Sequence, residues 1–106
     1  MPLQEQLPDE LPGMQRFLDQ WIRERGGYWS PLSQYARLAE EVGEFGRELN
    51  FQFGDKPRSA KDAGGSLTDE LGDVFFIVLL MANDLGIDLH SALYATLAKY
   101  GQRLGQ

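Results

Sequence analysis

Apolar residues recur along this chain at helical spacing, and no segment sustains the alternation of apolar and polar residues that predicts a strand. The first periodic stretch ends at the pair Gly26-Gly27, which suits a helix C-terminus. Residues 1–11 lack periodicity, so we expect a flexible N-terminal arm over 1–11 and a helical domain over 12–106. The apolar positions of this first predicted helix are Met14, Phe17, Leu18, Trp21 and Ile22.

A second helix is predicted from Pro31 to about Asn50. Ser30 is a suitable N-cap, and proline fits the first helical position because its missing N–H is not needed there. Residues 51–65, with several glycines among charged residues, predict a long surface loop of the kind that often has a function. The apolar stripe of this helix consists of Tyr35, Leu38, Val42, Phe45 and Leu49.

A third helix is predicted to open at the capping pattern Ser66-Leu67-Thr68-Asp69. From Val74 to Ala82 it is apolar on every side, which predicts a helix buried all round, either in a bundle or at a subunit interface. This run is far shorter than the ~20 residues needed to span a bilayer.

A fourth helix is predicted after Gly86, which ends the third, with Asp88 as its N-cap. The pattern as a whole therefore predicts an all-α fold with four main helices in a bundle. The residues of the fourth helix expected to face inward are Leu89, Leu93, Leu97, Tyr100 and Leu104.

Two acidic clusters stand out against this helical pattern, the sequences E-E-V-G-E over residues 40–44 and E-L-G-D over residues 70–73. Carboxylates three or four residues apart share one helix face, about 5–6 Å apart at Cβ, and repel each other. A solvated helix face would explain the first cluster alone. The second lies on an otherwise apolar helix, so the two together indicate that a cation belongs there.

Carboxylates on two facing helices suit a hard divalent cation such as Mg²⁺, which usually completes its coordination with water and substrate phosphate. Two such ions could bridge a phosphate and lower the pKa of a water, and a further carboxylate could accept its proton. Lys99 and Arg103 could neutralise phosphate charge. The alternative for this pair is a favourable interaction with the helix dipole alone.

Composition removes several other classes of function. The net charge of −6 argues against nucleic acid or an anionic membrane as the main partner. The chain has no cysteine, which excludes disulfides and thiolate zinc sites, and its N-terminus does not resemble a signal peptide, so we expect a cytoplasmic protein. The only histidine, His90, is not part of a Glu-x-x-His pair, which argues against a di-iron bundle.

The order E-E-x-x-E, spacer, E-x-x-D resembles the MazG-like nucleoside triphosphate pyrophosphohydrolases. The resemblance covers about residues 14 to 103, and its flanking segments are similar to the short, single-domain YpjD-like branch. These segments are Gly27-Tyr28-Trp29-Ser30-Pro31-Leu32, Ala36-Arg37-Leu38, Asn50, Gly54-Asp55-Lys56-Pro57, Ala82-Asn83 and Lys99-Tyr100.

The resemblance implies an all-α MazG fold and Mg²⁺-dependent hydrolysis of (d)NTPs to (d)NMP and pyrophosphate, with Mn²⁺ able to substitute and nucleotide-pool house-cleaning as the role. It implies that Glu40 is an extra ligand or the base that orients the attacking water, and it places Glu41 in the catalytic machinery as well as at the metal. The implied metal ligands are Glu41, Glu44, Glu70 and Asp73.

For the substrate, the resemblance implies that Lys99 and Arg103 contact phosphates and that Asn83 and Trp29 contact the nucleoside. For Trp29, a place in the core or an interface is the alternative. The resemblance also implies a homo-oligomer, and the abundant apolar surface favours a tetramer over a dimer. A non-enzymatic scaffold or nucleotide sensor is the competing class of function. Phosphoribosyl-ATP pyrophosphatase, from the same superfamily, fits these flanks poorly.

Overall fold

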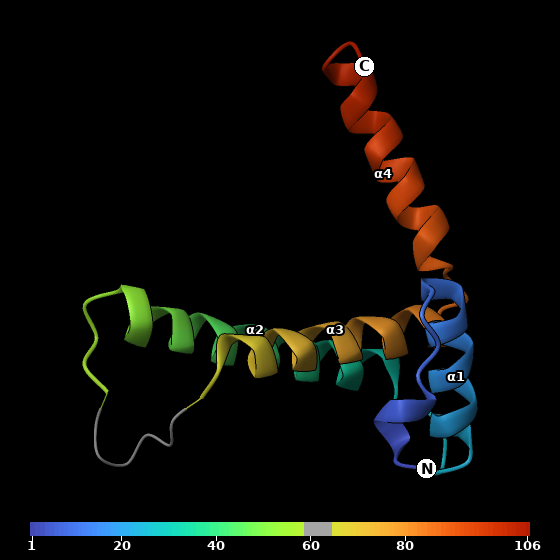
Figure 1. Cartoon of the computed structure of the whole chain (residues 1–106), viewed down its shortest axis with the longest axis horizontal. Helices are drawn as coiled ribbons and strands as arrows, with labels where there is room; N and C mark the ends of the chain where they lie inside the picture. The colour runs from blue at the N-terminus through green and yellow to red at the C-terminus, as the bar shows by residue number, and fades with distance from the viewer. Residues whose placement is uncertain (59–64) are drawn as a thin grey trace. The chain divides into compact units, whose positions relative to one another are not determined.

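The computed structural model describes residues 1–58 and 65–106, and within them the chain forms helices and no strand. The all-α prediction with four α-helices is confirmed. A short 3₁₀ helix, η1, lies within the predicted N-terminal arm, whose boundary stays a prediction. The elements are η1 (Leu3–Gln6), α1 (Leu11–Arg23), α2 (Pro31–Phe53), α3 (Leu67–Asp84) and α4 (Leu89–Arg103) (Figure 1).

Side-chain caps begin three of the helices as the sequence predicts. The Ser30 hydroxyl accepts a hydrogen bond from the backbone N–H of Ser33 at the start of α2. Ser66 accepts one from the N–H of Asp69 before α3, at 3.1 Å. The Asp88 carboxylate accepts one at 2.9 Å from an N–H in the first turn of α4. Each cap satisfies a backbone donor that has no partner within its helix.

Helix α2 continues beyond the predicted end near Asn50 to Phe53, and the backbone N–H of Gly54 bonds to the Asn50 carbonyl. The predicted loop at 51–65 therefore begins later than expected. Its residues 59–64 lie outside the described part of the chain.

The chain divides into two units, which are described separately. The first consists of Met1–Tyr28 and Leu79–Gln106, and the second of Trp29–Val78. Helix α3 therefore contributes its last residues to the first unit and its earlier ones to the second.

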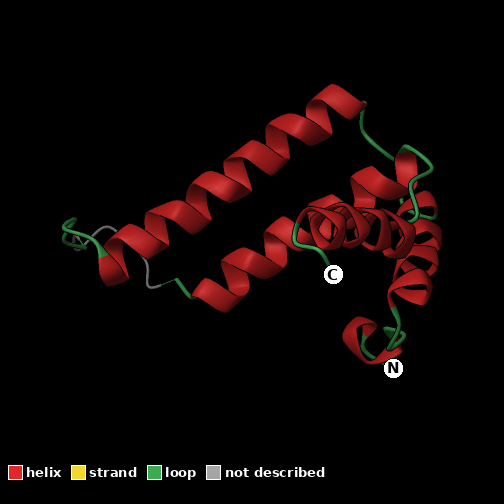
Figure 2. Ribbon diagram, turned by 90° about the horizontal axis from the view of Figure 1, so that it is seen from above, coloured by secondary structure: helices red, strands yellow, loops and turns green. Residues whose placement is uncertain are grey.

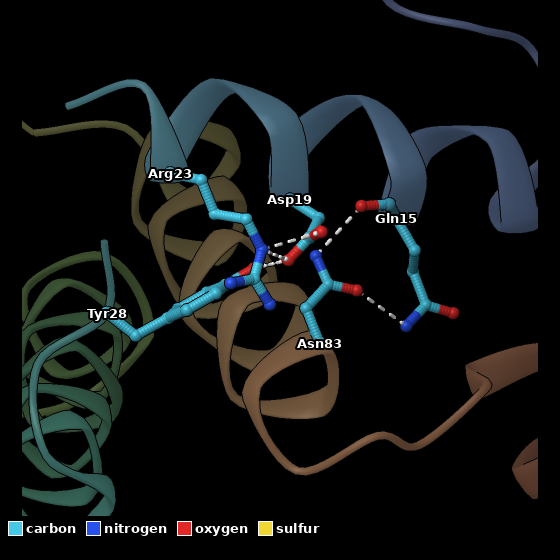
Figure 3. A network of polar contacts seen from close by, with 5 residues as sticks. All are labelled: Gln15, Asp19, Arg23, Tyr28 and Asn83. Atoms are coloured by element: carbon cyan, nitrogen blue, oxygen red, sulfur yellow. Dashed lines mark hydrogen bonds and ion pairs between the residues drawn. The ribbon is translucent and has the colours of Figure 1, made fainter. Parts of the chain in front are cut away.

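In the first unit, a buried glutamine holds the connection between α3 and α4 against α1. Gln15 Nε2 donates to the Asn83 side chain at 3.1 Å and to the Ile87 carbonyl at 2.9 Å, and Gln15 Oε1 accepts from Leu89 N–H at 2.8 Å. Asn83 returns a hydrogen bond to the Gln15 carbonyl, as Figure 3 shows. These bonds satisfy polar groups that would otherwise be costly to bury. The apolar side chains buried in this unit are Leu18, Leu79, Leu80 and Ala82.

A second polar contact in this unit joins α1 to the segment that leads to α2 (Figure 3). Tyr28 donates a hydrogen bond from its hydroxyl to Asp19 at 2.5 Å, and Arg23 donates from Nε to both oxygens of the same carboxylate at 3.0 Å. These hydrogen bonds, that of Tyr28 first, lower the pKa of Asp19. Burial and the bond to Asp19 raise the pKa of Tyr28 to about 12.

In the second unit, α2 and the first part of α3 run in opposite directions (Figures 1 and 2). The buried positions of α2 are all polar: Gln34, Glu41 and Glu48, spaced seven residues apart. Seven residues are close to two helical turns, so the three lie along one face. The buried face of α2 is therefore a line of polar side chains, while apolar residues such as Val42 and Tyr35 are exposed.

One sequence prediction about burial is wrong for the single chain. Helix α4 buries no residue, and of its predicted inward set Leu93, Leu97, Tyr100 and Leu104 are exposed. Helix α3 leaves Phe75 exposed in the single chain, so of the two predicted settings the subunit interface stays a prediction. Periodicity predicts which residues share a face, whereas burial needs a second surface to cover that face. Within the described residues, no helix is long and apolar enough to cross a bilayer.

Candidate metal and active site

Three carboxylates of the second unit come together. One oxygen from each of Glu41, Glu44 and Glu70 lies within 4.8 Å of the other two. Glu41 and Glu44 stand one turn apart on α2, and Glu70 stands in the first turn of α3. The two acidic motifs are thus adjacent in space as well as prominent in sequence. We call these three residues the carboxylate triad.

Two of the triad oxygens are buried and lack a hydrogen-bond partner among the described residues: Glu41 Oε2 and Glu70 Oε2. The other oxygen of Glu41 accepts a hydrogen bond from Arg37 Nε at 2.8 Å. Buried carboxylate oxygens are normally hydrogen-bonded or coordinated to a metal. The triad therefore fits a divalent cation with oxygen ligands, such as Mg²⁺.

The electrostatics of the triad agree with that chemistry. Burial raises the pKa of Glu70, and the negative charges of Glu44, Asp73 and Glu41 raise it further. Without a cation, the site therefore disfavours the ionised form of Glu70. A divalent cation would reverse this balance, because it favours the ionised ligands.

The remaining acids of the two motifs border the triad without joining it. Asp73, one turn beyond Glu70 on α3, is exposed, and its charge contributes to the raised pKa of Glu70. Glu40 is exposed on α2. The pKa of Arg37 is raised mainly by its hydrogen bond to Glu41, with smaller contributions from the charges of Glu40 and Asp73. The charges of the motif acids therefore act on the same two neighbouring groups, the Glu70 carboxyl and the Arg37 guanidinium.

Sequence reasoning missed Glu48, which is only 5% exposed and lies on the same face of α2 as Glu41. Arg58 and Gln52 bond to its carboxylate. The seven-residue spacing from Glu41 was the available signal. It was not recognised because Glu48 lies outside both acidic motifs.

The predicted nucleoside contacts occupy different settings. The Trp29 side chain is exposed, and its backbone carbonyl accepts a hydrogen bond from Gln34. An exposed ring is compatible with base stacking. Asn83 lies in the first unit with both ends of its amide bonded to Gln15, so a structural contact accounts for its position there.

The predicted phosphate contacts, Lys99 and Arg103, are exposed on α4 in the first unit. The Arg103 guanidinium lies 5.6 Å from the centre of the Tyr100 ring. Both cations are accessible to an anion, and their role in phosphate binding stays a prediction.

Comparison with known proteins agrees with this geometry. Residues 29–105 match the family model of the MazG nucleotide pyrophosphohydrolase domain, a stretch that contains the whole triad. The chain is 40% identical over 94 residues to YpjD of Bacillus subtilis (strain 168), an uncharacterized protein, covering 88% of this chain and 85% of that protein.

Two crystal structures are similar to this chain in sequence and fold. That of YpjD from Bacillus subtilis has a TM-score of 0.77 at 37% identity, with 88% of this chain and 96% of that chain covered. That of the Bacillus-conserved MazG protein, a nucleotide pyrophosphohydrolase, has a TM-score of 0.75 at 38% identity, with 88% and 90% covered.

Proposed function

This chain belongs to the MazG nucleotide pyrophosphohydrolase family, and from that membership we propose that it hydrolyses (d)NTPs to (d)NMP and pyrophosphate in a Mg²⁺-dependent reaction. The bond cleaved joins the α and β phosphates. The observation that carries the proposal is the carboxylate triad, with its two buried oxygens that lack a partner among the described residues.

The proposed metal ligands are the three triad residues together with Asp73, which lies one turn from Glu70 on α3. Oxygen ligands favour Mg²⁺, and Mn²⁺ accepts the same donors, so we propose that Mn²⁺ substitutes. A bound divalent cation supplies a Lewis acid that neutralises phosphate charge and increases the acidity of water.

The chain's own residues supply the remaining steps. Glu40, exposed beside the triad, is the proposed base that orients the attacking water and accepts its proton. Arg37 holds one oxygen of Glu41 at 2.8 Å, which fixes the direction of the other oxygen. Glu41 thereby acts as a metal ligand within the catalytic machinery.

Substrate contacts are proposed for four residues beyond the triad. Lys99 and Arg103 would neutralise the polyphosphate, and their exposure leaves both cations accessible. Trp29 would stack on the base with its exposed ring. Asn83 is the remaining proposed nucleoside contact, in addition to the structural contact with Gln15.

We also propose that the protein acts as a homo-oligomer, with a tetramer favoured over a dimer. The support is the apolar face of α4 that the single chain leaves exposed, including Leu97 at 61% and Leu104 at 70%. An exposed apolar face of this kind is typical of a surface that a partner covers. The role proposed for the enzyme is nucleotide-pool house-cleaning in the cytoplasm.

The proposal is tested by measuring pyrophosphate release from a panel of canonical and modified (d)NTPs with Mg²⁺, with Mn²⁺ and with EDTA. Metal-dependent release from one or more substrates is expected, and the panel would identify the preferred base. If the folded protein binds metal and nucleotide without releasing pyrophosphate over hours, the sensor interpretation replaces the enzyme.

A further inference from the structure

A second buried carboxylate lies beside the triad and plays no part in the reaction proposed above. Glu48 follows Glu41 by seven residues on the buried face of α2, and it is 5% exposed. A buried carboxylate next to three others would add to their repulsion unless a cation neutralised it. The partners of Glu48 therefore determine how much repulsion it adds to the carboxylate triad.

Arg58 is the cation that neutralises Glu48. Its Nη2 donates to Glu48 Oε1 at 2.6 Å, and its Nη1 donates to Oε2 at 3.3 Å. The guanidinium also lies 4.7 Å from the centre of the Phe51 ring, and Gln52 donates to Oε1 at 2.9 Å. A bidentate arginine that also packs on an aromatic ring fixes a carboxylate in one orientation.

Gly65 connects this pair to the triad. A Cβ at Gly65 would lie 2.9 Å from Glu48 Oε2 and 3.6 Å from Glu70 Oε1, so the two carboxylates approach the same point beside its backbone. Gly65 immediately precedes Ser66, whose carbonyl accepts the backbone N–H of Glu70 and whose hydroxyl caps α3. The carboxylates of Glu48 and Glu70 therefore both lie near this point beside Gly65, close enough for the orientation of one to affect the other.

We propose that Glu48 and Arg58 form a positioning pair that holds Glu70 in the orientation required for metal binding. The proposal rests on the proposed function, because it assumes that Glu70 is a metal ligand. Arg58 draws the Glu48 carboxylate into a fixed bidentate contact and thereby keeps its charge away from the metal-facing oxygen of Glu70. Neither Glu48 nor Arg58 touches the substrate in this account.

The direction in which one substitution changes metal affinity distinguishes a positioning role from a simple effect of charge. Arg58→Met removes a positive charge near an acidic site, and by charge alone this would strengthen the binding of a cation. If Arg58 positions Glu48, and Glu48 in turn positions Glu70, the same substitution weakens metal binding. The loss of a residue that orients a metal ligand typically reduces affinity by about 10–100-fold.

The experiment measures Mn²⁺ affinity of the full chain by electron paramagnetic resonance, with circular dichroism to confirm the fold of each variant. Arg58→Met is compared with Arg47→Met, a matched control for the loss of one positive charge: Arg47 lies 5.2 Å from the centre of the same Phe51 ring, and its charge lowers the pKa of Glu48 less than the hydrogen bond from Arg58 does. The double variant Glu48→Gln/Arg58→Met removes both charges and so leaves no buried uncompensated carboxylate, and it is measured if Arg58→Met fails to fold.

We expect about a tenfold or greater loss of Mn²⁺ affinity in Arg58→Met and in the double variant, partial rescue in Arg58→Lys, and less than about a twofold change in Arg47→Met. Unchanged or tighter binding in folded Arg58→Met, or in the double variant, would overturn the positioning role and leave the proposed function intact. If the wild type binds no Mn²⁺, or if Glu41→Gln binds it as tightly, the proposed metal site itself fails.

Discussion

Arg37 donates a hydrogen bond to one oxygen of Glu41 and leaves the other oxygen of the same carboxylate buried without a partner among the described residues. The carboxylate is thus fixed at Oε1 and open at Oε2. Because one oxygen of each triad residue lies within 4.8 Å of the other two, an ion bound at Glu41 would also be within reach of Glu44 and Glu70. Arg37 therefore pairs with one oxygen of a side chain that is only 6% exposed, and a metal ion would pair with the other.

Replacement of Glu41 by glutamine is expected to abolish the metal response while the fold survives. For the wild type, Mg²⁺ at ten times its dissociation constant should add about 1.4 kcal/mol of stability, measured by thermal unfolding. Glu41→Gln should lose this increment and lower pyrophosphate release by at least about 10–100-fold, the loss typical even of a residue that only orients a metal ligand. Glu24→Gln, at an exposed position after α1, serves as the control and should retain both. Full activity in Glu41→Gln would rule out its proposed role.

The pH dependence of the metal-free protein should reveal the repulsion at Glu70. Its raised pKa means that the protonated side chain stabilises the fold below its ordinary value of 4.5, and that this stability is lost as pH rises through the folded pKa. Because glutamine does not ionise, the Glu70→Gln variant does not lose this stability as the pH rises. In EDTA at neutral pH its melting temperature should exceed that of the wild type by about 1–4 °C. The difference should vanish below pH 4.5; a difference that persists there would mean that repulsion is not its cause.

Tyr28 should give the protein a distinct alkaline transition. Burial and the hydrogen bond to Asp19 raise its pKa to about 12, so its contribution to stability is fully present below about pH 10 and is lost as pH rises through 12. The stability advantage of the wild type over Tyr28→Phe, measured by denaturant unfolding, should shrink between pH 10 and 12. Tyr94→Phe, at an exposed tyrosine, is the control. A constant advantage across this range would contradict the prediction.

Gln15→Leu should destabilise the fold although it adds an apolar side chain to a buried position. The Ile87 carbonyl and the Leu89 N–H would lose their partner, as would the Asn83 side chain, at a cost of about 1–3 kcal/mol measured by denaturant unfolding. Gln20→Leu, at an exposed site on the same helix, should change stability by less than about 0.5 kcal/mol. Equal effects of the two substitutions would contradict the structural role of Gln15.

Asn83→Ala separates the observed contact with Gln15 from the proposed contact with the nucleoside. Both contacts involve the same side-chain amide. Loss of the hydrogen bonds to Gln15 is expected to lower the stability of the variant without changing KM. A rise in KM, measured at a temperature where the variant is fully folded, is expected if Asn83 also contacts the nucleoside. An unchanged KM would restrict Asn83 to its structural role.

The sequence predicted features that depend on near neighbours. The caps at Ser30, Ser66 and Asp88 each involve a residue three positions away, and all three are present. The acidic motifs were recognisable because their spacing places carboxylates on one helix face. That these motifs meet across α2 and α3 was predicted from the facing-helix arrangement, and the triad agrees with it.

Features that depend on residues distant in the sequence were harder to predict from it. Glu48 is paired with Arg58, which lies ten residues further along the chain, beyond the end of α2. No local sequence pattern predicts this pair. The same reason applies to Gln15, whose partners are 68 to 74 residues away. Leu93 and Leu97 were expected to be inward because they share a stripe, and the single chain does not cover that stripe.

The central claim, that this chain cleaves the bond between the α and β phosphates of a nucleoside triphosphate at the carboxylate triad, is tested most directly by ³¹P NMR of the reaction products. With Mg²⁺ and a substrate from the panel, the account predicts equal amounts of (d)NMP and pyrophosphate, and no reaction in Glu41→Gln. Formation of nucleoside diphosphate and orthophosphate, or the same products at the same rate in Glu41→Gln, would contradict it.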